Sequence, residues 1–151
     1  MAPRLKTQLA LVALLGIFLI PLVFSSLNGL KHVLTCHHRF GNAVTVEVPA
    51  RGLPTIGGSR GAVRVDGDPM CEGLQPSMVV RPDGERFVSV EFPIANRSVH
   101  TWRASVRLRV GNTSVPVDVG AIAAGTTGQA TVRVRLETGK VVVRAELLAG
   151  P

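Results

Sequence analysis

The stretch that decides the fold is WRASVRLRVGNTSVPVDVG, which runs from Trp102 to Gly120. In its first half, apolar residues occupy every second position, and the positions between them are polar or charged. A period of two is typical of a β-strand that buries one face. Gly111 and Asn112 then supply a tight turn, after which valines resume the alternation. The stretch therefore predicts two consecutive strands, the first with an outward face rich in arginine.

The same alternation recurs on both sides of this stretch. It is found in the segments 43–48, 62–66, 78–81, 86–94, 130–137 and 141–147. Loops rich in Gly, Pro, Asn and Asp separate these segments, and no segment outside the apolar N-terminal run has a helical period. Several short strands at this spacing predict an all-β domain, an immunoglobulin-like β-sandwich.

An uncharged apolar run from Leu9 to Leu30 precedes the strands. At about 1.5 Å per helical residue, roughly twenty positions cross a bilayer core of about 30 Å. Arg4 and Lys6 stand before the run, and positive charge there favours keeping that end in the cytoplasm. We therefore expect a single N-terminal transmembrane helix with the C-terminal bulk outside.

This expectation divides the chain into four parts. They are a cytoplasmic basic cap (1–8), a transmembrane signal-anchor (9–30), a juxtamembrane segment (31–42) and an extracytoplasmic β-sandwich (43–151). A second fate stays open, in which the run is a secretory signal cut near Ser25 or Ser26. The protein would then be secreted.

The chain carries a formal net charge of +7. Predicted outward arginines form one row on the strand 102–110, and a second row is expected on the opposite sheet. The first row comprises Arg103, Arg107 and Arg109, and the second Arg133, Arg135 and Arg144. The first row is a possible surface for an anionic polymer or an acidic partner; the alternative is a solvated face that discourages aggregation. A domain outside the cell, without interleaved aromatic residues, does not fit nucleic acid.

Two cysteines, Cys36 and Cys71, fall within the exported part. An even count in such a domain predicts a disulfide, worth roughly 3–4 kcal/mol. The bond would staple the segment leaving the membrane to the domain body. His37 and His38 beside Cys36 invite a zinc or copper interpretation. Adjacent strand residues point to opposite faces, however, and we expect no metal.

Two sequons, at Asn96 and Asn112, lie in predicted loops and are possible glycosylation sites. The sequence contains no nucleophile elbow, paired carboxylates or phosphate loop. We therefore expect a protein that is not an enzyme and that needs no cofactor.

Residues 87–148 resemble the CARDB domain, a cell-adhesion-related immunoglobulin-like module of bacterial and archaeal surface proteins. The resemblance rests on VSVEFPIANRS (88–98), on WRASVRLRVGNTSVPVDVG and on AIAAGTTGQATVRV (121–134). Family members continue with another strand after the one at 141–147. Either an early strand (43–48 or 62–66) completes this sheet, or an edge stays open to a partner's strand.

The resemblance implies binding or structural work at the cell surface. Together with the apolar run, it predicts a non-catalytic, membrane-anchored binding or accessory module. Its partner would be a protein or an anionic envelope component. The alternatives are a secreted binding or structural protein and a pilin-like filament subunit.

Overall fold

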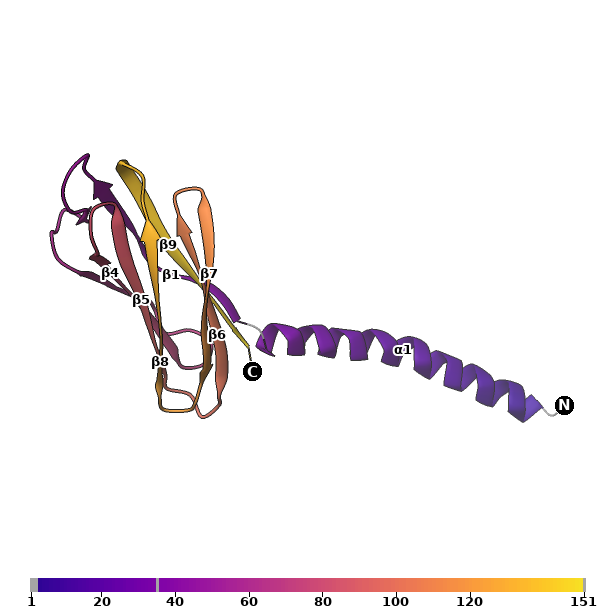
Figure 1. Cartoon of the computed structure of the whole chain (residues 1–151). Helices are drawn as coiled ribbons and strands as arrows, with labels where there is room; N and C mark the ends of the chain where they lie inside the picture. The colour runs from indigo at the N-terminus through magenta and orange to yellow at the C-terminus, as the bar shows by residue number, and fades with distance from the viewer. Residues whose placement is uncertain (1–2, 35, 151) are drawn as a thin grey trace. The chain divides into compact units, whose positions relative to one another are not determined.

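The chain consists of a helical unit and a β-unit, which are described separately (Figure 1). The computed structural model describes the backbone of residues 3–34 and 36–150, and the side chains of residues 6–24, 36–39 and 43–150.

The N-terminal unit is one helix, α1 (Pro3–Leu34), of 32 residues. Its segment Lys6–Phe24 is long and apolar enough to cross a membrane, and none of that segment is buried within the protein. Pro21 lies inside the helix, which membrane helices tolerate. The helix thus has the length and composition of a transmembrane or signal segment, as the sequence predicts.

Over residues 36–150, the β-unit contains nine strands in two antiparallel sheets. The strands are β1 (Cys36–Val48), β2 (Thr55–Ile56), β3 (Val63–Asp66), β4 (Leu74–Pro82), β5 (Phe87–Asn96), β6 (Trp102–Val110), β7 (Thr113–Ile122), β8 (Thr127–Arg135) and β9 (Gly139–Gly150). Sheet A has the order β2-β1-β9-β6-β7, and sheet B has the order β3-β4-β5-β8. The predicted β-sandwich is confirmed.

The core lies between the two sheets and is built from the alternating apolar residues. In β5 and β6 every second side chain is buried, and Phe92 and Leu108 are fully enclosed. Burial of a side chain of this size stabilises the fold by roughly 1.5–3 kcal/mol. The strands therefore present their apolar positions inward and leave the intervening positions on two outer faces.

The strand pairing places β1 on the free side of β9. The pairs β5–β8 in sheet B and β6–β9 in sheet A correspond to the B–E and C–F neighbours of immunoglobulin sandwiches. Beyond β9, Val46 pairs with Val141 and Val44 with Val143. Of the two arrangements expected from the sequence, the structure therefore has the one in which the early strand 43–48 completes the sheet.

The predicted juxtamembrane segment 31–42 is corrected by the structure. Helix α1 continues to Leu34, and β1 already begins at Cys36. The pairing register of β1 with β9 shifts between Phe40 and Val44, and such an irregularity interrupts the period-two pattern. For this reason the sequence pattern places the start of the sandwich at residue 43, seven positions too late.

Candidate functional site

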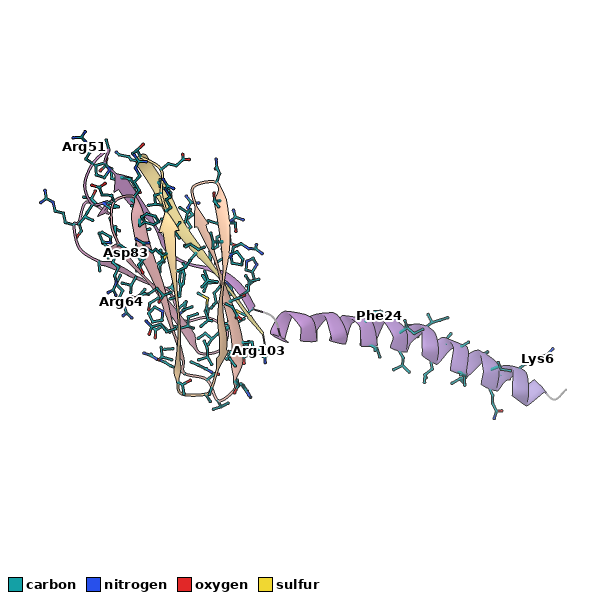
Figure 2. All side chains as sticks on the ribbon, in the orientation of Figure 1. Lys6, Phe24, Arg51, Arg64, Asp83 and Arg103 are labelled. Carbon is teal, nitrogen blue, oxygen red and sulfur yellow. A yellow bond between two sulfur atoms is a disulfide. The ribbon has the colours of Figure 1, made fainter. Side chains whose placement is uncertain are left out.

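The outer face of sheet A gathers most of the unneutralised positive charge of the sandwich. This surface, called here the basic face, carries the cations Arg39, Arg103, Arg107, Arg109, Lys140 and Arg144 and the carboxylates Glu47, Asp118 and Glu146. Arg103 lies on this side of the sandwich, and Arg64 of sheet B lies on the other side (Figure 2). The strands of sheet A thus display twice as many cations as carboxylates.

Glu146 lies at the centre of the basic face, on β9. Arg39 of β1 and Arg107 of β6 are its directly opposite neighbours. The Glu146 side chain is only 6% exposed although it points outward. The longer side chains on both neighbouring strands cover it.

Three arginine side chains and one histidine side chain approach the Glu146 carboxylate. His37 donates its Nε2–H to Oε2 at 3.3 Å, and Arg39 Nε lies 3.4 Å from Oε1. Arg109 Nε lies 3.7 Å from Oε1, and Arg107 Nη1 lies 3.9 Å from Oε2. One carboxylate is therefore shared among three guanidinium groups and an imidazole.

The surroundings of Glu146 lower the pKa of its carboxyl group. Burial alone would raise the pKa of the carboxyl group, but the hydrogen bond from His37 and the positive charges of Arg109 and Arg39 outweigh burial and hold the pKa below its ordinary value. The carboxylate is thus ionised at neutral pH and acts as a fixed negative centre.

The three guanidinium groups around Glu146 keep most of their donors unused. Each guanidinium has five N–H donors, and the separations of 3.4 to 3.9 Å exceed the 2.7–2.9 Å typical of charge-assisted hydrogen bonds. Within the described part of the chain, the guanidinium groups of Arg39, Arg107 and Arg109 make no hydrogen bond that meets distance and angle criteria. The basic face can therefore donate several hydrogen bonds to an anion.

The predicted arginine rows are partly rearranged in the structure. Arg103, Arg107 and Arg109 share the outer face of β6 as expected. Arg144, expected on the opposite sheet, instead lies on β9 directly opposite Arg109, whereas Arg133 and Arg135 lie on β8 of sheet B. The alternation fixes whether a side chain points outward, but it does not specify which strands are neighbours.

On the outer face of sheet B, arginines pair one to one with carboxylates. Arg64 pairs with Asp66 at 2.7 Å, Arg81 with Glu91 at 3.0 Å and Arg133 with Asp83 at 2.8 Å. In each of these three one-to-one pairs, the guanidinium group donates a hydrogen bond to its carboxylate. This face neutralises most of its own charge.

The predicted disulfide between Cys36 and Cys71 is confirmed, with the two Cα atoms 5.6 Å apart. Cys36 is the first residue of β1, and Cys71 lies in the turn before β4, so the bond joins sheet A to the entry of sheet B. Both cysteines belong to the β-unit, so the bond acts within the sandwich and not on a separate linker. Because Cys36 is oxidised, its thiol is not available as a metal ligand.

The turn that carries Cys71 has an unusual backbone. Cys71, Glu72 and Gly73 all have positive φ angles, and a side chain at Gly73 would meet the backbone nitrogen of Ser98 at 2.9 Å. The Gly73 carbonyl accepts the Arg97 N–H at 2.7 Å. The turn is thus held both by the disulfide and by the loop after β5.

The sequon at Asn96 is incompatible with a glycan in this folded structure. Asn96 is 1% exposed, and its Nδ2 donates to the carbonyls of His100 and Ile122 at 2.7 and 2.9 Å. Its Oδ1 accepts from the N–H and the hydroxyl of Ser98. A glycan on Nδ2 would displace the bonds that Nδ2 donates, so Asn96 serves as a buried structural residue that joins the loop after β5 to the end of β7.

The asparagine of the second sequon is exposed, in contrast to Asn96. Asn112 is exposed in the turn between β6 and β7, where an acceptor is accessible. Its glycosylation stays a prediction. A cavity of about 420 Å³ lies beside this turn and is lined by residues of the β6–β7 and β8–β9 turns, including Arg135 and Glu137. None of the residues that surround the Glu146 carboxylate lines this cavity.

Glu146 and Arg39 are the two members of this site that the sequence pattern does not reveal. The partners of Glu146 come from β1 and β6, up to 109 positions away in the chain, so the local pattern cannot show them. The one signal in the sequence is the outward position of Glu146 on the strand 141–147.

Comparisons with known protein families, characterised proteins and solved structures find no match for this chain. The resemblance of residues 87–148 to CARDB domains therefore stays a prediction.

Proposed function

We propose that this protein is a non-catalytic, membrane-anchored binding module whose sandwich lies outside the cytoplasm and whose basic face binds an anionic partner. The observation that carries the proposal is the gathering of Arg39, Arg107 and Arg109 around one carboxylate on an exposed sheet face. A face with surplus cations raises the local concentration of anionic partners and speeds their association.

Two further observations support the location. The segment Lys6–Phe24 has the length and composition of a membrane span, and Arg4 and Lys6 at its start favour a cytoplasmic N-terminus. The disulfide between Cys36 and Cys71 is typical of domains outside the reducing cytosol. A helix that stays uncut makes the protein a single-pass anchor, and cleavage makes it the secreted alternative.

Fractionation of cells that produce the full chain with a C-terminal epitope tests the proposed location. We expect an uncut mass, retention in membranes after alkaline carbonate washing, and digestion of the epitope by protease added outside intact cells. Loss of roughly the first 25 residues, the length of a secretory signal, with a soluble sandwich would favour the secreted protein. An epitope protected until the cells are opened would contradict the proposal.

A further inference from the structure

The basic face has the properties of a site for a polymer of phosphate groups, and this inference rests on the function proposed above. Around Glu146 stand Arg39, Arg107, Arg109 and Arg144, four permanent cations against one carboxylate. A ligand with a single negative charge would leave most of this surplus unbalanced. The charge count therefore favours a ligand with several anionic groups.

The spacing of the guanidinium groups follows from sheet geometry. Arg107 and Arg109 project from the same face of β6 two positions apart, which places their Cα atoms about 7 Å apart. Arg39 and Arg107 flank Glu146 on the two neighbouring strands, so their backbones are about 10 Å apart. The donors thus form a two-dimensional array, which suits an extended chain of anionic groups better than one small molecule.

The chemistry of the array favours phosphate. Guanidinium groups donate two parallel hydrogen bonds to phosphate or carboxylate oxygens. Protein interfaces are in addition anchored by buried aromatic and other apolar side chains. Among the described side chains, the outer face of sheet A carries no aromatic residue: Phe92 and Trp102 are buried, and Phe87 lies under Arg133 of sheet B. An acidic protein would find no aromatic anchor among the described side chains there.

Sheet B provides an internal reference for this interpretation. Three of its four strand arginines each hold a carboxylate at 2.7 to 3.0 Å, so some of their donors are already engaged. The guanidinium groups near Glu146 lie farther from their shared carboxylate, and their side chains are 45 to 78% exposed. Of the two outer faces, as far as their side chains are described, the basic face is the one that combines surplus charge with unused donors in an accessible array.

We infer that Arg39, Arg107 and Arg109, held around Glu146, form a binding site for a linear phosphodiester polymer of the cell envelope. Arg144 and Arg103 extend the site along β9 and β6. The polymer lies across β1, β9 and β6, and its phosphate oxygens accept hydrogen bonds from the guanidinium groups. No covalent chemistry is involved.

The test measures binding of synthetic glycerol-phosphate oligomers of increasing length to the full-length protein in nanodiscs of zwitterionic lipid. We expect affinity to rise with oligomer length until the oligomer spans the face. Affinity should fall with added salt, and the logarithmic slope should be about −2 for three phosphate contacts on a single chain, at about −0.7 per contact. The triple variant R39Q/R107Q/R109Q should lose at least about tenfold in affinity and most of that slope.

Poly-L-glutamate of matched charge separates this inference from the proposed function. Weaker binding of poly-L-glutamate than of the oligomers supports the phosphate assignment. Equal or tighter binding of poly-L-glutamate, with the same loss in the triple variant, overturns the phosphate assignment but leaves an anion-binding module. If neither polymer binds, both the assignment and the anionic partner are contradicted.

Discussion

The outer faces of the two sheets contain the same kinds of residue but use them in opposite ways. On sheet B, three arginines each hold their own carboxylate at 3.0 Å or less. On sheet A, Arg39, Arg107 and Arg109 share the carboxylate of Glu146 at 3.4 to 3.9 Å. The net charge of the chain is therefore unevenly displayed, and the number of arginines on a face does not by itself identify a binding surface.

The difference teaches that strand order decides what an outward arginine can do. Arg81 and Glu91 lie on the hairpin-connected strands β4 and β5, so each finds the other locally. Glu146 stands between β1 and β6, each of which brings arginines to the same carboxylate. The shared carboxylate on sheet A is the observation on which the proposed anion-binding surface rests; the one-to-one pairs of sheet B serve as its reference.

The largest expected effect concerns the bond that joins the two sheets. The double variant C36S/C71S removes the link between β1 and the turn before β4 and should lower the free energy of unfolding by about 3–4 kcal/mol. Urea denaturation of the variant beside the oxidised wild type measures this loss. An unchanged midpoint would mean that β-sheet pairing alone holds the start of β1. The position of Arg39 on sheet A would then not depend on the disulfide.

A smaller effect is expected from the carboxylate at the centre of the basic face. E146Q removes the carboxylate that accepts the His37 hydrogen bond and leaves the three surrounding arginines without a counter-charge. It should cost about 1.5–3 kcal/mol, the range for hydrogen bonds to charged groups. E91Q on sheet B removes one exposed pair and should cost at most about 1 kcal/mol. Urea midpoints of both variants at neutral pH test the contrast, and a larger loss for E91Q would refute it.

The pH dependence of stability should show the same contrast. Because the pKa of Glu146 is lowered in the folded protein, its contribution is present above the pKa of the unfolded carboxyl group, about 4.3, and is lost as the pH falls through the folded value. The stability difference between the wild type and E146Q should thus be constant near neutral pH and shrink as the solution is acidified below about pH 4. A difference that grows on acidification would have the wrong sign.

The smallest expected effect comes from two arginines that face each other. Arg109 and Arg144 are directly opposite on β6 and β9, and like charges in this position are destabilising. R144Q should therefore stabilise the sandwich by about 0.2–0.5 kcal/mol, and R135Q on β8 serves as the control with the same change of net charge. Thermal melts of both variants at low salt measure the difference, which should vanish at high salt; stabilisation by R135Q alone would argue against local repulsion.

Much of the fold follows from local patterns, because the period of two is a property of each strand by itself. The predicted strand at 102–110 matches β6 at both ends, and the two cysteines predict their own pairing. The start of β1 escapes prediction because its register with β9 is irregular after Phe40.

The candidate site is less accessible from sequence because its members come from separate strands. The outward direction of Arg107 and Arg109 follows from alternation, but the position of Arg144 beside them depends on the neighbour relation of β6 and β9. The burial of Asn96 likewise depends on the loop after β5 and on the end of β7, whose carbonyls accept its hydrogen bonds. Contacts between distant segments are set by tertiary packing and leave no mark on the local pattern.

The most direct test of the account compares two double variants that remove the same charge from opposite faces. R107Q/R109Q acts on the basic face, and R81Q/R133Q acts on the paired arginines of sheet B. In binding measurements with glycerol-phosphate oligomers at fixed salt, we predict that R107Q/R109Q weakens affinity at least about tenfold, corresponding to 1.4 kcal/mol or more, and that R81Q/R133Q changes it less than about threefold. Equal losses in the two variants would show that overall charge attracts the polymer, and would contradict the assignment of binding to sheet A.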